Sequence, residues 1–404
     1  MSQGTKRAAP QAGAMFGGLR VLDVASFVAA PSAATILADF GADVIKIEPP
    51  DGGDPMRSFH LAPGLTPTEH AYFWTIVGRN KRSVALDLKQ PADREKLYAI
   101  VRTADVFITN MPLKARERLG IRWEDVRHLN DRLVYASFTG YGETGAEKDL
   151  AAFDATAWWA RSGLMDQVRP SDDSVPARST PGMGDQMGAL ALYGAIVSAL
   201  YRRERTGRGA HVGSSLIANG AWSNAISIQG AVAGVAPPRP VPRLEVRNPL
   251  GNHYLCGCGR WLTLSVTASQ QAQCWPALTR ALGLEQLTDD PRFATMAARA
   301  GRAPELIRLL DDAFARRPAQ EWSALLTGAG VPHAVVARAM DAAHDAQMLA
   351  TGVLTPMQGL PGAPYTIDSP LWIEDEPKRP PAPPPELGAH NEEILAECAA
   401  AQQA

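Results

Sequence analysis

The sequence lacks the features that mark several large classes of protein. Its 404 residues include only four cysteines, too few for a disulfide framework, and no apolar run approaches the roughly 20 residues that span a bilayer. The formal net charge is -2, so neither a nucleic acid nor an acidic membrane surface is expected as a partner. Lys6 and Arg7 are not followed by a hydrophobic segment, so no secretory signal is expected. These absences favour a protein of the reducing cytoplasm.

Motifs for metals and for tightly bound cofactors are also lacking. Cys256 and Cys258 resemble half of a zinc site, but no second Cys/His pair stands at metal spacing, so no metal is expected. Residues 26–31, which follow the first expected strand, contain no glycine, whereas a dinucleotide fingerprint requires Gly-x-Gly-x-x-Gly at that point. The sequence therefore argues against a nicotinamide or flavin enzyme, and no tightly bound cofactor is expected.

The first half of the chain alternates between strand and helix patterns. Strands are expected at 19–24, 43–48, 83–88, 105–109 and 133–137, with helices at 31–40 and 91–103 and short helical pieces at 116–119 and 123–129. Pro31 suits the first turn of its helix, and Gly41 suits the position that follows the last turn. This alternation predicts an α/β fold, a Rossmann-like doubly wound domain with a parallel sheet.

A second, smaller unit of the α+β class follows. Its expected elements are a strand at 261–266 and helices at 271–282, 304–316 and 318–327. The predicted organisation is a disordered tail (1–15), the first part of the large domain (16–225), a linker (226–245), the small domain (246–328), and a return linker with a C-terminal part that completes the large domain (329–404).

One acidic residue stands at the expected start of a long helix. Residues 181–185 read Pro-Gly-Met-Gly-Asp, and a helix is expected over 185–205. Aspartate is a favoured helix N-cap, and capping alone accounts for Asp185. The same position would also stabilise an ionised, nucleophilic carboxylate, while the glycines would let backbone N–H groups approach a thioester oxygen. The residues alone leave both roles open.

Short segments in a fixed order give a more specific signal. They lie at 18–23, 37–48, 80–83, 86–89, 118–120, 133–137, 184–185 and 206–209. In this order they resemble the class III CoA-transferases, the family of formyl-CoA:oxalate and carnitine CoA-transferases, which shares its fold with alpha-methylacyl-CoA racemase. The resemblance implies that Asp185 is the nucleophile, forming first a mixed anhydride with the acyl group and then an aspartyl-CoA thioester.

The resemblance also implies substrates, contacts and an assembly. The substrates would be an acyl-CoA donor and a carboxylic acid acceptor, and the protein would form an interlocked homodimer. Contacts to CoA are expected from Val28, Ala29, Leu86, Asp87, Lys89, Asn110 and Arg118, with Arg118 suited to a phosphate and Asp154 close to the nucleophile. Two positions depart from the family pattern, because Ala30 replaces a glycine in the first turn and Pro49 replaces a basic residue.

The resemblance also places four residues in the acyl pocket: Phe153, which precedes Asp154, and Trp158, Trp159 and Arg161, which lie between Asp154 and Asp185. If the tryptophans line the pocket they favour a bulky or apolar acyl group, and Arg161 would hold a second carboxylate; packing in the core is the alternative for the tryptophans.

Two other functions stay open. The racemases place a histidine in a Gly-His-Asp stretch, but this chain has Ala152-Phe153-Asp154, and Phe153 cannot move a proton. A non-catalytic CoA-binding protein is the second alternative, and the intact Asp185 argues against it.

Overall fold

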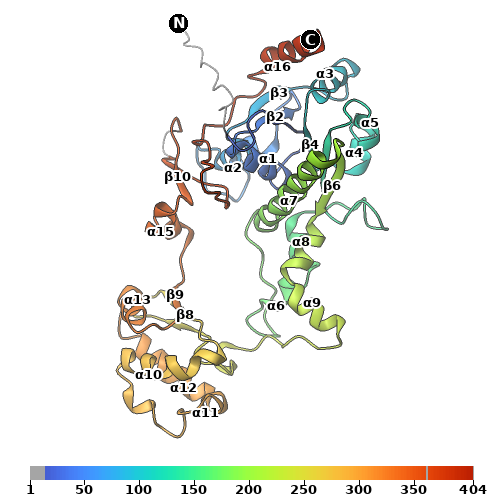
Figure 1. Ribbon diagram of the computed structural model, residues 1–404. Coiled ribbons are helices and arrows are strands. Elements are labelled where there is room, and N and C mark those ends of the chain that lie inside the picture. Colours follow the sequence, from blue (N-terminus) through green and yellow to red (C-terminus); the bar gives the residue numbers. More distant parts are fainter. Residues whose placement is uncertain (1–13, 361–362, 404) are drawn as a thin grey trace. The chain divides into compact units, whose positions relative to one another are not determined.

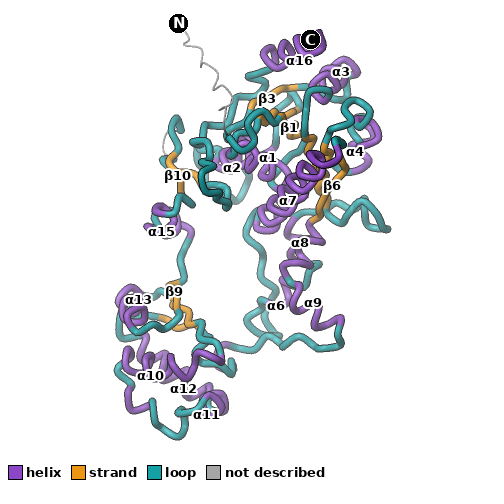
Figure 2. Tube along the Cα trace, in the orientation of Figure 1, coloured by secondary structure: helices purple, strands orange, loops and turns teal. Residues whose placement is uncertain are grey.

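A computed structural model describes residues 14–360 and 363–403, so the predicted tail lies outside the described residues except for Ala14 and Met15. The chain forms two compact units (Figures 1 and 2). The larger unit takes its described residues from Met1–Asp166, Arg178–Ala236 and Ala346–Ala404, and the smaller from Gln167–Ala177 and Pro237–Asp345. The smaller unit thus extends past the predicted bounds of 246–328 and includes the earlier segment Gln167–Ala177.

The larger unit is built on a parallel sheet of six strands. Their order is β3-β2-β1-β4-β5-β6, with bounds β1 (Arg20–Asp23), β2 (Asp43–Glu48), β3 (Arg82–Ala85), β4 (Val106–Thr109), β5 (Val134–Thr139) and β6 (Ala210–Ser215). The α/β class predicted from the alternation is confirmed. The sequence did not predict β6, because this edge strand alternates small and polar residues and buries little of its length.

Helices cover both faces of this sheet. Val21, Val44 and Val106 pack on the side of α1 (Ala29–Asp39) and α7 (Met183–Thr206). Leu22, Ile45 and Phe107 pack on the side of α3 (Pro91–Val101) and α16 (Asn391–Gln403). The strand order reverses between β1 and β4, and in such sheets ligands bind beyond the carboxyl ends of the strands at this switch point.

Shorter elements complete the larger unit. They are α2 (Tyr72–Gly78), α4 (Leu113–Leu119), α5 (Trp123–Val126), α6 (Leu164–Gln167), α8 (Leu216–Ser223), α9 (Ala225–Val232), α15 (Ala346–Ala350), a π-helix (Asp154–Ala160), 3-10 turns (Pro55–Arg57 and Phe59–Leu61) and the antiparallel pair β10 (Leu354–Pro356) and β11 (Tyr365–Ile367). Helix α9 occupies the first part of the segment interpreted as a linker, because its many apolar residues form a helix whose side chains stay partly or fully exposed.

The smaller unit combines an antiparallel sheet with helices. The sheet order is β7-β8-β9, with β7 (His253–Leu255), β8 (Trp261–Leu264) and β9 (His333–Val335). The helices are α10 (Gln271–Leu282), α11 (Met296–Gly301), α12 (Ala303–Phe314), α13 (Ala319–Gly328) and α14 (Ala339–Ala342), with 3-10 turns at Arg243–Glu245, Ala268–Gln270 and Glu285–Leu287. Tyr254, Phe314 and Trp322 are buried at its centre.

A buried ion network joins the carboxyl ends of the first strands. Asp23, at the end of β1, accepts from Lys81 Nζ at 2.7 Å and from Lys46 Nζ at 3.5 Å, and all three side chains are buried. Lys46 also pairs with Asp54 at 2.8 Å, and Lys81 donates to the Pro31 carbonyl in α1 at 2.7 Å. The network therefore fixes the ends of β1 and β2 relative to α1 and to the segment that enters β3.

We expect Asp23→Asn to destabilise the protein by about 3–5 kcal/mol, because it leaves two buried ammonium groups short of a counter-charge. Urea unfolding followed by circular dichroism measures the loss. The matched control is Asp93→Asn, which breaks an exposed pair with Lys96 and should cost less than about 1 kcal/mol. Equal losses in the two variants would contradict a structural role for the network.

Candidate active site at the start of α7

Asp185 lies in the first turn of α7 but is not its cap. The helix begins at Met183, and the N-cap residue is Gly182, whose φ of +74° places it in the left-handed region that glycine adopts without strain. A Cβ added at Gly182 would lie 3.7 Å from Val28 Cγ1, so the turn before the helix approaches the start of α1. The capping role that the sequence left open for Asp185 is therefore wrong.

Two glycines let α7 pack closely on the core beside Asp185. A Cβ at Gly184 would lie 2.6 Å from Trp158 Cγ, and a Cβ at Gly188 would collide with the ring of Phe138. Asp185 lies next to this tightly packed stripe and is half-buried. Its carboxylate accepts no hydrogen bond from any residue that the structure describes, so both oxygens are available to a substrate.

Asp154 caps α7 from outside the helix. Its Oδ2 accepts from the Gly184 N–H at 3.3 Å, and its Oδ1 accepts from the Ala155 N–H at 2.7 Å. The first N–H groups of a helix have no partner within it, and a negative charge is favourable at this end. Asp154 therefore holds the start of α7 and places a second carboxylate near Asp185.

The protonation of Asp185 is set by these surroundings. Burial, and secondly the negative charge of Asp154, raise the pKa of Asp185 from its ordinary value of 3.8 to about 7. The sequence predicted that the helix terminus would favour the ionised carboxylate, but the pKa of Asp185 is raised, which favours the protonated form. A carboxyl group whose pKa lies near neutrality, with a specific charged neighbour, is typical of a functional site.

The turn after β1 is joined to the loop after β4. The Ser26 N–H donates to Asn110 Oδ1 at 2.9 Å, and Asn110 Nδ2 donates to the Ser26 carbonyl at 2.7 Å. Val28 and Ala29 follow in this turn, Val28 half-buried and Ala29 buried. Three of the predicted CoA contacts therefore lie at the switch point of the sheet, where a ligand is expected.

Phe27, which no sequence pattern indicated, has a strained backbone in the same turn. Its φ of +64° is unfavourable for a residue with a large side chain, and such strain costs about 1–3 kcal/mol. The Phe27 N–H donates to Asp54 Oδ1 at 3.3 Å, and Asp54 pairs with Lys46 of the buried network. The surrounding contacts therefore hold this conformation in place.

The other predicted CoA contacts lie beyond β3 and on α4. Leu86 is buried and its N–H donates to the Glu48 carbonyl at 2.8 Å, while Asp87 accepts from the backbone N–H of the exposed Lys89 at 3.1 Å. Arg118 is exposed and forms no ion pair within the described part of the chain, so its guanidinium is free to bind a phosphate.

Of the four predicted pocket residues, Phe153 is the one whose side chain is largely exposed and, within the described residues, forms no ion pair or core contact. Trp158 and Trp159 are buried and stack with their centroids 5.7 Å apart in the core that α7 covers, as the packing alternative expects. Arg161 pairs with Glu147 at 3.1 Å and lies over the ring of Tyr141. Phe153 is 63% exposed.

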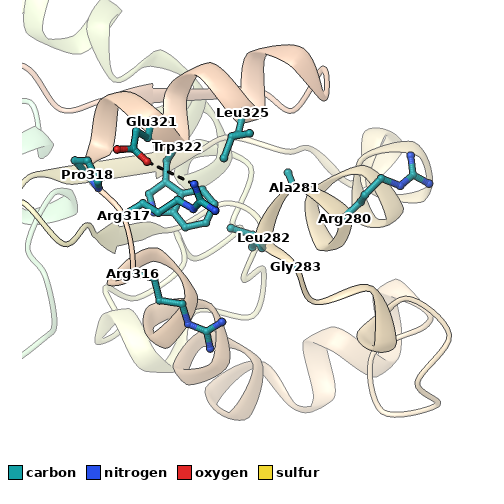
Figure 3. Close-up of a pocket in the computed structure, with 10 residues that line it drawn as sticks. All are labelled: Arg280, Ala281, Leu282, Gly283, Arg316, Arg317, Pro318, Glu321, Trp322 and Leu325. Carbon is teal, nitrogen blue, oxygen red and sulfur yellow. Dashed lines mark ion pairs between the residues drawn. The ribbon is translucent and has the colours of Figure 1, made fainter.

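A cavity of about 670 Å³ lies elsewhere, in the smaller unit (Figure 3). Its lining includes Arg280, Leu282, Arg317 and Trp322, and Arg317 pairs with Glu321 at 3.5 Å. None of the predicted site residues lines it. Among residues 14–360 and 363–403, no cluster of His, Cys, Asp and Glu side chains is arranged to hold a metal ion, and no helix has the length and apolarity to cross a membrane.

The larger unit combines a doubly wound sheet with a carboxylate, Asp185, whose pKa is raised and which accepts no hydrogen bond from the described residues. These features are typical of an enzyme whose ligand binds at the carboxyl ends of the strands. The family model described as CoA-transferase family III matches residues 16–391. The chain belongs to this family and is a CoA-transferase, an enzyme whose substrates are CoA thioesters.

Curated relatives match over most of the chain. It is 30% identical over 382 residues to the (R)-2-hydroxy-4-methylpentanoate CoA-transferase of Clostridioides difficile, which covers 94% of both chains. It is 32% identical over 378 residues to the acetyl-CoA:oxalate CoA-transferase of Acetobacter aceti, covering 91% of this chain and 92% of that one. The solved structure of a CAIB/BAIF family protein from Brucella suis superposes with a TM-score of 0.83 at 27% identity, over 96% of this chain and 100% of that one.

The raised pKa of Asp185 makes a prediction about stability. The folded state binds this proton more tightly than the unfolded chain, so the carboxyl lowers stability progressively as the pH rises from about 4 to about 7. We expect Asp185→Asn to raise the melting temperature more at pH 8.5 than at pH 5, as measured by calorimetry. In an Asp154→Asn background this pH effect should shrink; a gain that is independent of pH would contradict the raised pKa.

Proposed function

We propose that this protein is an acyl-CoA:carboxylate CoA-transferase that acts through Asp185. The observation that carries the proposal is the half-buried Asp185 carboxylate, which has no hydrogen-bond partner among the described residues and whose pKa is raised to about 7. A carboxylate nucleophile suits the transfer of CoA, because the anhydride and thioester that it forms keep the acyl group activated. Hydrolysis would waste this energy, so the bound complex must exclude water.

The chemistry proceeds by four balanced displacements. A carboxylate oxygen of Asp185 attacks the thioester carbonyl, the C–S bond breaks, and a mixed anhydride and the CoA thiolate result. The thiolate attacks the Asp185 carbonyl carbon, which releases the donor acid as its carboxylate and leaves an aspartyl-CoA thioester. The acceptor carboxylate displaces the thiolate to form a second anhydride, and the thiolate then attacks the acceptor's carbonyl carbon. The products are the new acyl-CoA and the free carboxylate of Asp185.

The surroundings of Asp185 assist this sequence in two ways. Asp154 engages the Gly184 N–H, which orients the start of α7 and therefore the nucleophile. The raised pKa makes Asp185 a stronger base and nucleophile than an ordinary carboxylate, while a substantial fraction stays ionised at neutral pH.

For CoA we propose the switch point of the sheet. Val28 and Ala29 would contact the part of CoA nearest to Asp185, since the first turn approaches Gly182. Leu86, Asp87, Lys89 and Asn110 would border the nucleotide, and Arg118 would bind a phosphate. The racemase alternative requires a second base where this chain has Phe153, so we do not adopt it.

The family resemblance also leads us to propose an interlocked homodimer, active in the cytoplasm. Helices α8 and α9 support an interface, because Trp222 is 82% exposed and Ile226 is 91% exposed. Large apolar side chains exposed in this way are typical of an interaction site. The four cysteines are all unpaired, as a reducing compartment permits.

We expect the protein to sediment at twice its chain mass of 43.2 kDa. Ile226→Glu should prevent the dimer from assembling, because burying an unpaired charge in an interface is unfavourable. The matched control is Val175→Glu, a similarly exposed apolar residue of the smaller unit, which should leave the mass unchanged. Sedimentation velocity distinguishes the outcomes, and a monomeric wild type would overturn the proposed assembly.

We expect incubation with a suitable acyl-CoA to modify Asp185 covalently. Hydroxylamine should convert the activated carboxyl to a hydroxamate, and borohydride should reduce the aspartyl thioester; mass spectrometry of the peptide locates either product. The yield at short times should rise with pH through about 7, as Asp185 ionises.

Asp185→Ala should abolish the modification, whereas Asp154→Asn should keep it and shift the pH dependence downward. Exchange of the alpha proton into solvent without any modification would favour a racemase. If neither signal appears with any donor, the protein binds CoA but does not carry out this chemistry.

A further inference from the structure

Two exposed phenylalanines meet beside the nucleophile. The rings of Phe27 and Phe153 lie 6.3 Å apart, edge to face at 82°, although Phe27 is 37% exposed and Phe153 is 63% exposed. They come from the turn after β1 and from the residue that precedes the π-helix. An aromatic pair that leaves so much of its surface in water contributes little to the core.

Both residues are adjacent to contacts that reach the start of α7. Phe27 precedes Val28, which approaches Gly182, and Phe153 precedes Asp154, which accepts from the Gly184 N–H. The neighbours of both phenylalanines therefore contact the segment that leads directly into Asp185.

The backbones of both phenylalanines are fixed. Phe27 is held in its left-handed conformation by Asp54 on its own N–H and by Asn110 on both backbone groups of Ser26. The Phe153 N–H donates to Thr156 Oγ1 at 3.1 Å, and its carbonyl accepts from the Thr156 N–H at 3.0 Å. Strain retained in an exposed aromatic residue is typical of a functional position.

We propose that Phe27 and Phe153 form an aromatic wall that contacts the acyl group of the thioester and selects donors whose acyl group has an aromatic or branched apolar body. This inference rests on the proposed function. The reacting carbonyl must lie within about 3–3.5 Å of the Asp185 carboxylate, so the carbons beyond it extend among the groups around the nucleophile. Aromatic rings offer apolar and edge-to-face contacts there. Arg161, the cation expected to hold a second carboxylate, is already paired with Glu147.

Two donors with the same spacer test the wall. In 3-phenylpropionyl-CoA and succinyl-CoA, two methylenes separate the thioester carbonyl from a phenyl ring or from a carboxylate. The quantity measured is the ratio of single-turnover rates for forming the aspartyl-CoA thioester on Asp185. Because both donors carry the same CoA, changes in CoA binding cancel in this ratio.

We expect Phe153→Ala to lower the phenylpropionyl-to-succinyl ratio by at least about tenfold, the size of discrimination that one apolar group provides. Phe27→Gly should lower it in the same direction, since glycine keeps the left-handed backbone and removes only the ring. Phe153→Leu should retain most of the preference.

The matched control is Phe59→Ala. Phe59 is also 37% exposed and also forms an edge-to-face pair, with Phe73 at 4.9 Å, but it lies in a separate 3-10 turn. It should leave the ratio unchanged. A ratio that Phe153→Ala and Phe27→Gly do not move, with the thioester still formed, overturns the aromatic wall. Failure of the wild type to form any thioester on Asp185 overturns the proposed function instead.

Discussion

The buried ion network around Asp23 is the constraint on which the site depends. Charges placed in a protein interior need partners in good geometry, so Asp23, Lys46 and Lys81 admit few alternative arrangements. Lys81 reaches the Pro31 carbonyl and thereby fixes the start of α1. Lys46 reaches Asp54, which in turn holds the Phe27 N–H. The turn that is proposed to bind CoA is thus held in place by the ion pairs beneath it.

The two acids at the start of α7 interact differently with the end of the helix. Asp154 takes the Gly184 N–H and the favourable position at the positive end of the helix. Asp185 receives no such hydrogen bond, and both burial and the neighbouring charge raise its pKa. The raised pKa lowers the ionised fraction of Asp185 at neutral pH and increases the basicity of its carboxylate. It also lowers the stability of the free protein at neutral pH, a cost commonly seen at catalytic positions.

Patterns of local periodicity predicted the framework well and the site only in part. The strand at 43–48 and the helix at 271–282 have the bounds that their sequences indicate. Strand β6 and helix α9 escaped prediction because neither has a buried apolar face. The motif singled out Asp185 as a candidate, but it could not show that Asp154 would cap the helix, since that hydrogen bond joins residues 30 positions apart. The burial of Trp158 likewise depends on Gly184 of α7, which only the folded chain brings against its ring.

The chemistry and the choice of substrate are therefore encoded differently in this chain. Asp185, the proposed nucleophile, sits in a short motif that the resemblance to the family singles out from the sequence. The aromatic pair has no motif. In the proposed wall, Phe27 has a left-handed backbone whose N–H is held by Asp54, and Phe153 precedes the acid that is tied to α7. A change of acyl preference would require only a new side chain at either position, since the hydrogen bonds that hold both residues are made by their backbones and by their neighbours. The fold can thus keep one mechanism while the surface beside the nucleophile varies.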